Sequence, residues 1–299
     1  MVAERETKLS LLMKDNVVTA GGIRTAYVEA GSGRPLICIH GSEFAVDGRT
    51  SFQYQLSGLS DRFRVLVPDQ RHFGRTEYPL DRRYRNRLER TPHVIDFLEA
   101  LRLDQPAIVV GHSEGAFVAS LIAIRRPDLV AGLVLLTSSG TAPAFGDERD
   151  GGWEEASMRL YDYKRPQPTE AEFLDNLRSL FGKLDPEAEA LRKSAFETAT
   201  ANGQWELLAS DTDDGDASYS RLQETHLFPH LGALNCPVQI IWSKDDETAP
   251  AERGVLLAQR IQHADFHVLS GAKHAVQIHR FAAVNALIRA WSDTVPLGS

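Results

Sequence analysis

One stretch of the chain has the composition of a serine nucleophile held at a sharp turn. Residues 111–115 read Gly-His-Ser-Glu-Gly, directly after the apolar run Ala107–Val110 and directly before the helix-forming run Ala116–Ile124. A strand, a tight turn and a helix in this order expose the serine hydroxyl at the apex of the turn. Glycines fit on both sides because strand and helix approach too closely there for side chains. The pattern predicts that Ser113 is a catalytic nucleophile.

A serine hydroxyl needs a base to take its proton, and that base needs a carboxylate to orient it. In sites built on this turn, the acid and then the histidine follow the serine along the chain. His274 follows the apolar run Phe266–Leu269 on a glycine-containing loop, so it is the expected base. Two aspartates compete for the role of acid. Asp246 is favoured because its position four residues before Pro250 resembles the register in which many hydrolases with this turn place their acid, and Asp245 is then a turn carboxylate.

Negative charge that develops on a carbonyl oxygen needs preorganised donors, each worth roughly 3–4 kcal/mol. The backbone N–H of Glu114, directly after the nucleophile, is expected to be one donor. The backbone N–H of Ser42 is expected to be the other, in the loop that follows the apolar run Leu36–Ile39. Together they form the predicted oxyanion hole.

The elements that position these residues follow from an alternation of strand-like and helix-like segments. It predicts an α/β fold with a mostly parallel sheet and helices on both faces. The strand-like runs are Ile23–Glu29, Leu36–His40, Arg64–Val67, Ala107–Val110, Gly132–Leu136, Val238–Trp242 and Phe266–Leu269. The helix-like segments are Pro92–Leu101, Ala116–Arg125, Ala251–Ile261 and Gln277–Trp291.

The alternation stops between about Gly140 and Leu234. That stretch has amphipathic helical patterns at Glu170–Phe181 and Pro186–Thr200 and no convincing strand. We therefore expect a core domain of residues 1–140 and 235–299, with a helical cap, or lid, inserted at residues 141–234.

Composition narrows the expected partners. The 299 residues carry a net charge of −8, which disfavours nucleic acid and anionic membrane surfaces, so a small-molecule substrate is expected. No apolar stretch approaches the roughly 18 residues of a membrane span. The first residues lack a signal-peptide core, so we expect a cytoplasmic protein, as a monomer or homodimer. Histidines without metal-ligand spacing and the absence of a glycine-rich phosphate loop predict no metal and no cofactor.

Over nearly its full length the sequence resembles the α/β-hydrolase superfamily. Within it, the sequence is most similar to the meta-cleavage-product hydrolases, which cut carbon–carbon bonds in vinylogous 1,5-diketones. The residues that carry this likeness are Thr19–Tyr27, His40-Gly41-Ser42, and the segment from Ile241 through Asp246 to His274. The resemblance implies the α/β-hydrolase fold, with an eight-stranded sheet and an inserted cap. It also implies a triad of Ser113, Asp246 and His274, with Ser42 and Glu114 as oxyanion donors.

A second stretch, Pro68–Thr76, is similar to the P-D-x-R-G-x-G-x-S element of many α/β-hydrolases. Asp69, Arg71 and Gly74 match it, whereas His72 replaces a glycine. The resemblance implies a structural role, in which this loop is pinned beneath the active site.

Some positions depart from the family pattern. Glu43 and Phe44 stand where the family has a glycine- and proline-rich loop, and Glu114 replaces a residue that is often apolar. Glu43 and Phe44 are candidate substrate contacts, as is Arg192, the counterpart of a cap arginine that grips the substrate carboxylate. Glu43 and Glu114 would disfavour a strongly anionic ligand, unless they face solvent or pair with an arginine.

These observations predict a serine-dependent hydrolase of a small organic substrate held under the cap. The bond cut is an ester, a lactone or an activated carbon–carbon bond of the 1,5-diketone type. One alternative is a non-hydrolytic use of the same fold, as a perhydrolase, cofactor-free oxygenase or acyl transferase. The other is a ligand-sensing binding protein.

Overall fold

The sheet of this computed structural model has the predicted architecture. The structure describes residues 13–152, 155, 162–181, 184–210, 215–246 and 248–296, with the backbone alone for 179–181 and 215–220. One eight-stranded sheet has the order β1-β2-β4-β3-β5-β6-β7-β8. Strand β2 is antiparallel to β1 and β4, and the other neighbouring pairs are parallel. The expected mostly parallel eight-stranded sheet is confirmed.

The elements have the following bounds. The strands are β1 (Lys14–Ala20), β2 (Ile23–Ala30), β3 (Arg34–Ile39), β4 (Phe63–Pro68), β5 (Ala107–His112), β6 (Val130–Leu136), β7 (Val238–Ser243) and β8 (Ala264–Leu269). The longer helices are α2 (Gly48–Leu59), α3 (Arg87–Leu101), α4 (Glu114–Arg125), α6 (Glu170–Phe181), α7 (Pro186–Ala201), α9 (Gly215–His226), α10 (Ala251–Ala258) and α12 (Phe281–Ser292). The short ones are α8 (Gln204–Ala209), α11 (Val276–His279), η1 (Pro127–Leu129) and η2 (Phe228–Ala233).

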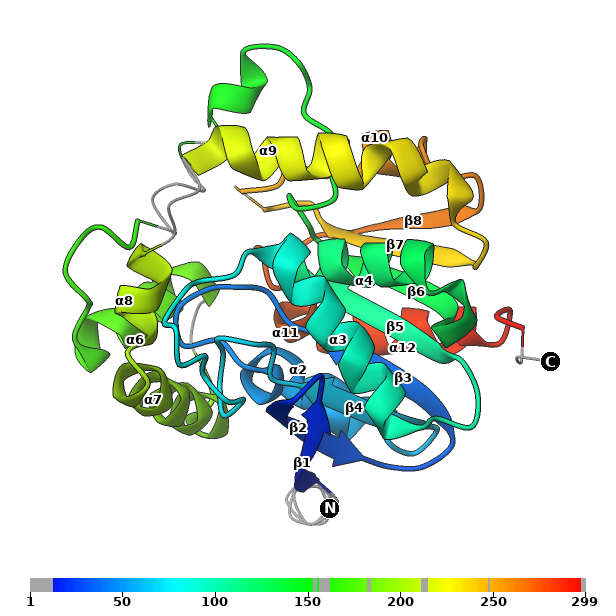
Figure 1. The fold of residues 1–299 in the computed structure, drawn as a ribbon. Helices are drawn as coiled ribbons and strands as arrows, with labels where there is room; N and C mark the ends of the chain where they lie inside the picture. Colours follow the sequence, from blue (N-terminus) through cyan, green and yellow to red (C-terminus); the bar gives the residue numbers. More distant parts are fainter. Residues whose placement is uncertain are drawn as a thin grey trace.

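Helices cover both faces of the sheet (Figure 1). Helices α2, α11 and α12 pack on one face and α3, α4 and α10 on the other, each set around its own buried cluster. Strand β5 contributes to both clusters. Ile108 and Val110 belong to the cluster under α2, α11 and α12, and Val109 belongs to the cluster under α3, α4 and α10. Successive side chains of a strand alternate between faces. A strand covered on both faces therefore needs apolar residues at every position, which explains the unbroken apolar run before Ser113.

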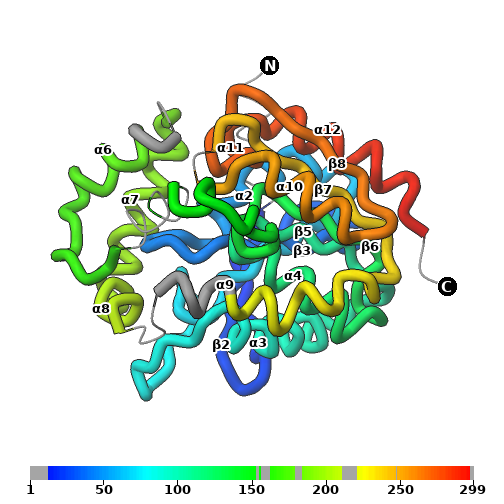
Figure 2. Tube along the Cα trace, turned by 90° about the horizontal axis from the view of Figure 1, so that it is seen from above, coloured from blue at the N-terminus to red at the C-terminus, as the bar shows by residue number. Residues whose placement is uncertain are grey.

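The helices between β6 and β7 lie in two places. Helices α6, α7 and α8 stand together at one end of the molecule, whereas α9 runs along the body of the core (Figure 2). Leu222 of α9 and Leu227, which follows it, pack with the core cluster that also contains α3 and α4. The part of the predicted cap that overhangs the end of the sheet is therefore α6–α8.

Among the differences from the expected elements, strand β1 and the start of helix α3 have clear local causes. Strand β1 was not predicted, because it is an edge strand in which only Ala20 is buried and the apolar signal is weak. Helix α3 begins at Arg87 and not at Pro92. The side chain of Asn86 accepts hydrogen bonds from the backbone N–H groups of Leu88 and Glu89, and this N-cap starts the helix one turn before the proline.

None of the helices in the described part of the chain has both the length and the apolar character of a membrane span.

The close approach of α4 to β3 leads to a prediction about stability. A Cβ on Gly115 would overlap the backbone carbonyl oxygens of Ile39 and His40. Gly115→Ala is expected to lower the free energy of unfolding by about 1–3 kcal/mol or more, because backbone must move. Gly232→Ala is the control, since no heavy atom lies within 4 Å of the added methyl. Urea denaturation measures both variants, and equal stability of the two would contradict the predicted overlap.

Candidate active site

Ser113 sits at a strained turn between β5 and α4. Its backbone angles, φ 54° and ψ −127°, are unfavourable for a residue with a Cβ. The surroundings hold the turn on both sides: the Ser113 N–H donates to the carbonyl of Leu136 at 3.2 Å, and the Ser138 hydroxyl donates to the Ser113 carbonyl at 2.6 Å. The strain therefore persists because β6 and the residues after it fix both backbone polar groups of the serine.

His274 lies on the loop after β8 and faces the Ser113 hydroxyl. Its Nε2 is 3.0 Å from the Ser113 Oγ, and its Nδ1 is 2.7 Å from Oδ2 of Asp246. This geometry suits an imidazole that donates from Nδ1 to the carboxylate and accepts from the serine at Nε2. The structure thus brings together the three residues that the sequence singled out.

The Asp246 carboxylate is oriented by donors on its other oxygen. Oδ1 accepts from the N–H and the hydroxyl of Thr248, both at 2.8 Å, and from the N–H of Ala249 at 3.2 Å. Oδ2 is left for His274. The competing Asp245 is exposed and accepts from the Gly271 N–H at 2.6 Å, which is the role of a turn carboxylate. Asp246 is the carboxylate next to His274.

The electrostatics of this pair favour a protonated imidazole beside an ionised carboxylate. Burial lowers the pKa of His274, but the charge and hydrogen bond of Asp246 and the charge of Glu43 raise it further, to above its ordinary value. Burial raises the pKa of Asp246, but His274 and the hydrogen bonds from Thr248 lower it by more, to below its ordinary value. An imidazole in this setting gains stability when it takes a proton.

The backbone N–H groups of Ser42 and Glu114 are available beside the serine. Within the described residues, neither N–H donates to another protein group. Gly41 keeps this space open, because a Cβ on it would stand 3.2 Å from the Cβ of Ser113. A carbonyl oxygen next to Ser113 is thus the kind of acceptor these two groups could take.

The side chain of Glu114 is not directed at a ligand. Its carboxylate forms ion pairs with Arg90 at 2.5 Å and Arg87 at 3.5 Å, and it also has a hydrogen bond from the Ser42 side chain. Burial raises the Glu114 pKa, but the two arginines and Ser42 lower it by more. Pairing with arginine was one of the two outcomes left open above. Because the arginines offset its charge, the Glu114 carboxylate does not disfavour an anionic ligand.

The other candidate substrate contacts lie in different surroundings. Glu43 is half-buried, and its charge acts on both His274 and Arg192. Arg192 of α7 is buried and donates to the Thr50 carbonyl at 3.3 Å. Phe44 is only 7% exposed and packs against aromatic rings of the cap.

Two buried side chains, those of His40 and Asp69, hydrogen-bond to the backbone of loops near the site. Burial lowers the pKa of His40 to about 3, and its ring donates to the Gly41 carbonyl and accepts from the Gln70 N–H. Burial raises the pKa of Asp69 to about 7, and this carboxyl group accepts from the backbone N–H groups of Gly48 and Arg75. These contacts agree with a structural role for the loop that begins at Pro68.

Three residues next to the site were not singled out from the sequence. Thr248 donates to the Asp246 carboxylate and so orients it. The Nε2 of His112 is 3.1 Å from the carbonyl oxygen of His274. Gln204 accepts a hydrogen bond from Ala45, in the loop after Ser42. The position of Thr248, two residues after the acid, was a local signal that could have found it. Gln204 has no such signal, because it lies 159 residues from its partner Ala45.

Comparison with other sequences places this geometry among known proteins. Residues 34–281 match the family described as alpha/beta hydrolase fold. A 2-hydroxymuconate semialdehyde hydrolase from Pseudomonas putida is 30% identical over 280 residues, which cover 89% of this chain and 90% of that protein. Another, from Pseudomonas sp. (strain CF600), is 28% identical over 278 residues, which cover 91% of each chain. The resemblance stated from the sequence is confirmed.

A solved structure shows the same fold. The 2-hydroxy-6-oxo-6-phenylhexa-2,4-dienoate hydrolase from Rhodococcus sp. strain RHA1 is similar with a TM-score of 0.77 and 20% identity. The match covers 94% of this chain and 99% of that one. The predicted fold class is confirmed.

The charge of Glu43 leads to a prediction about His274. A negative charge nearby stabilises the imidazolium, so Glu43→Gln is expected to lower the His274 pKa, and the ring stays neutral to a lower pH. NMR titration of the ring nitrogens measures this directly. Glu197→Gln, an exposed carboxylate of α7, is the control and should leave that pKa unchanged. An unchanged or higher His274 pKa in Glu43→Gln would contradict the predicted influence of Glu43.

Proposed function

We propose a substrate for this chain, which belongs to the α/β-hydrolase fold family and is a serine hydrolase of that fold. The chain hydrolyses a carbon–carbon bond in a small 2-hydroxy-6-oxo-2,4-dienoate. The bond is the one next to the 6-oxo group. Two observations support this substrate class: the names of the relatives that match along most of the chain, and a serine–histidine–carboxylate arrangement at hydrogen-bond distances.

Ser113 is the proposed nucleophile and His274 the general base. At 3.0 Å, the His274 Nε2 accepts the hydroxyl proton as the Ser113 Oγ attacks the ketone carbon. Positive charge then develops on the imidazole. The Asp246 carboxylate, 2.7 Å from Nδ1, stabilises that charge and keeps the ring in the tautomer that accepts at Nε2.

The former carbonyl oxygen becomes an oxyanion in the tetrahedral intermediate. We propose that the backbone N–H groups of Ser42 and Glu114 receive it. Each such donor is worth roughly 3–4 kcal/mol in the transition state, because it is already oriented before the charge appears. Ion pairs with Arg90 and Arg87 and a hydrogen bond from the Ser42 side chain hold the Glu114 carboxylate, and the two arginines offset its charge next to this site.

Collapse of the intermediate breaks the carbon–carbon bond. Cleavage requires the 2-oxo tautomer of the substrate, in which C5 has gained a proton and the 2-hydroxyl has lost one. The electron pair of the C5–C6 bond then moves through the C3=C4 double bond to the 2-oxo group, whose oxygen takes a proton, and the acyl group remains on Ser113. A water molecule that His274 deprotonates then attacks this ester and releases a carboxylic acid. Conjugation with the second carbonyl makes carbon an adequate leaving group, which is why an activated 1,5-diketone fits and a simple ketone does not.

The far end of the substrate is proposed to lie under the cap. Arg192 is the proposed contact for the substrate carboxylate, because it is a buried cation whose charge acts on His112, which is adjacent to the nucleophile. Glu43 and Phe44 stay candidate contacts, in the loop that carries Ser42.

The test is turnover of two substrates by the wild type and by Ser113→Ala. We expect the wild type to cleave a 2-hydroxy-6-oxo-2,4-dienoate, and the variant to lose at least about 10³-fold in kcat/KM. Ser194→Ala, an exposed serine of α7, is the control and should keep full activity. Absorbance of the conjugated substrate follows the reaction, with p-nitrophenyl acetate as the ester.

The outcomes separate the parts of the proposal. Ser113-dependent turnover of the ester alone would contradict the carbon–carbon bond and retain serine hydrolysis. Turnover that survives in Ser113→Ala would overturn the role of this serine.

A further inference from the structure

Two buried residues beneath the site have backbone conformations that disfavour side chains. Ala45, three residues after Ser42, has φ 58°, and His72 has φ 77°. Neither is glycine, which is the residue that adopts such angles without steric cost. Contacts from elsewhere must therefore hold both conformations.

One side chain of the cap contacts both strained residues. The Gln204 Oε1 accepts from the Ala45 N–H at 2.8 Å, and the Gln204 Nε2 donates to the His72 carbonyl at 2.8 Å. Gln204 is fully buried at the start of α8. A single amide with its donor and acceptor both used thus ties the loop after Ser42 to the loop after β4.

Aromatic contacts of Phe44 also hold the loop after Ser42. Phe44 makes edge-to-face contacts with Phe173, Phe196 and Trp205, at ring centroid distances of 6.1, 5.8 and 5.1 Å. These three rings come from α6, α7 and α8, so Phe44 is anchored in every helix of the overhanging cap. Residues 44 and 45 are therefore fixed by the cap rather than by the core.

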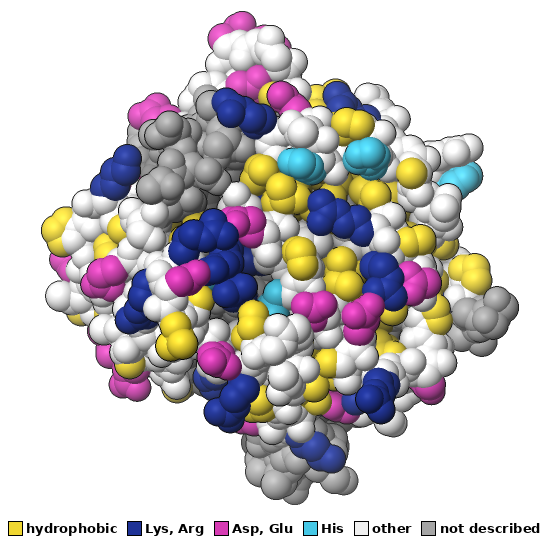
Figure 3. Space-filling view, viewed as in Figure 1, with side chains coloured by type: hydrophobic (Ala, Val, Ile, Leu, Met, Phe, Trp, Pro, Cys, Tyr) yellow, Lys and Arg dark blue, Asp and Glu magenta, His cyan; other side chains and the backbone are white. Residues whose placement is uncertain are grey.

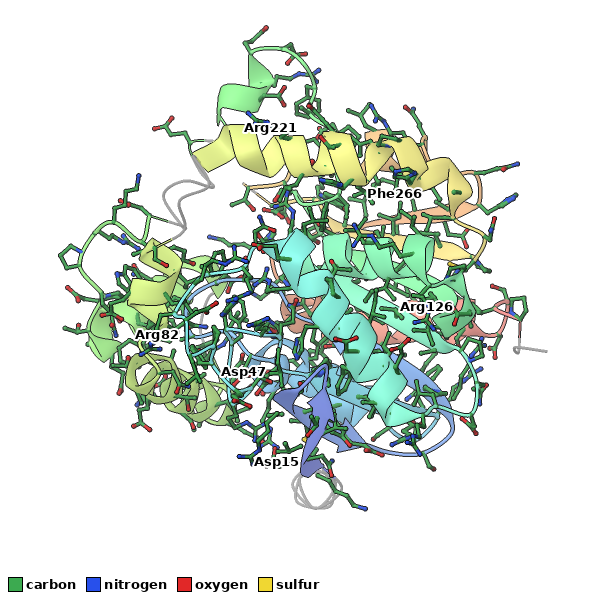
Figure 4. All side chains as sticks on the ribbon, in the orientation of Figure 1. Asp15, Asp47, Arg82, Arg126, Arg221 and Phe266 are labelled. Atoms are coloured by element: carbon green, nitrogen blue, oxygen red, sulfur yellow. The ribbon has the colours of Figure 1, made fainter. Side chains whose placement is uncertain are left out.

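The junction between α7 and α8 also contacts the loop after β4 at the surface. Arg82, labelled in Figure 4 beside these helices, donates to the Asn202 carbonyl at 2.7 Å, and the Asn202 side chain donates to the Gly74 carbonyl at 3.3 Å. Figure 3 shows arginine and lysine side chains gathered on this face of the molecule. The cap thus reaches both loops at once, through residues 202 to 205.

We propose that Gln204 is a positioning residue for the oxyanion hole. By holding Ala45 and His72 in their left-handed conformations, it sets the conformation of the loop that carries the Ser42 N–H, the proposed oxyanion donor. The hole is then complete only when the cap is seated on the core. This inference rests on the proposed function, because it assigns Gln204 to the transition state of that reaction.

Gln204→Leu removes both hydrogen bonds at nearly constant size. A displaced donor weakens the transition state more than the bound substrate, so kcat is expected to fall about 10- to 100-fold with little change in KM. Ala45→Gly in the Gln204→Leu background is expected to recover part of the lost kcat, because glycine adopts the positive φ unaided. Steady-state kinetics with the substrate that the wild type turns over measures both.

Gln55→Leu is the matched control. Gln55 is equally buried and also joins two segments, through bonds to the Gln277 carbonyl at 3.0 Å and the Asn285 side chain at 3.1 Å. Its variant should lose stability in a thermal melt and keep its kcat below the melting temperature.

Three results would overturn the inference while Ser113-dependent turnover by the wild type stands. One is an unchanged kcat in Gln204→Leu, and another is a raised KM alone. The third is a loss of kcat that Ala45→Gly leaves untouched or that Gln55→Leu shares. Absence of Ser113-dependent turnover in the wild type is a failure of the proposed function instead.

Discussion

The site depends on the backbone conformation of Ser113, which the close packing of β3, β5 and α4 imposes. Helix α4 can begin directly after β5 only because Gly111 and Gly115 leave room for backbone against backbone. That approach forces the serine into a strained turn, and the strain has two consequences for chemistry. The hydroxyl is exposed at the apex toward His274, and the next N–H, that of Glu114, is left without a protein acceptor among the described residues. One steric constraint therefore positions both the Ser113 hydroxyl, the proposed nucleophile, and the Glu114 N–H, a proposed oxyanion donor.

The charges around this turn are arranged so that each buried ion has a partner. Asp246 is ionised beside His274, and Glu114 is ionised between Arg87 and Arg90. An unpaired buried carboxylate would be costly, whereas a paired and hydrogen-bonded one is tolerated. Two carboxylates, those of Asp246 and Glu114, lie near Ser113, and only the Asp246 carboxylate contacts the His274 imidazole. Glu43 differs from both, since it is half-buried and influences His274 through its charge alone.

The core of the fold and the three residues that meet at Ser113 could be predicted from the sequence because both leave local signals. A fully buried strand such as β5 gives an unbroken apolar run in the sequence. Ser113 and Asp246 follow the fully buried strands β5 and β7, and His274 follows β8, which is only partly buried. Two elements were missed for different reasons. Strand β1 is an edge strand and mostly exposed, whereas α2 is buried but has polar residues, among them Thr50, Ser51 and Gln55, at buried positions, which weaken its apolar pattern. The contact of Gln204 with Ala45 could not be predicted either, because it joins distant segments through one polar side chain. The sequence left two surroundings open for the Glu114 side chain, solvent or an arginine, because the arginines that pair with it lie on another helix, α3.

The central claim is that Ser113 is the activated nucleophile and His274 its base. The most direct measurement is peptide mass spectrometry after reaction with a fluorophosphonate, which bonds covalently to an activated serine. We expect one label per chain, on Ser113, at a rate that falls as pH drops through the raised pKa of His274, because only the neutral imidazole accepts the proton. Labelling of another serine, or a Ser113 that stays unlabelled while the enzyme is active, would contradict it.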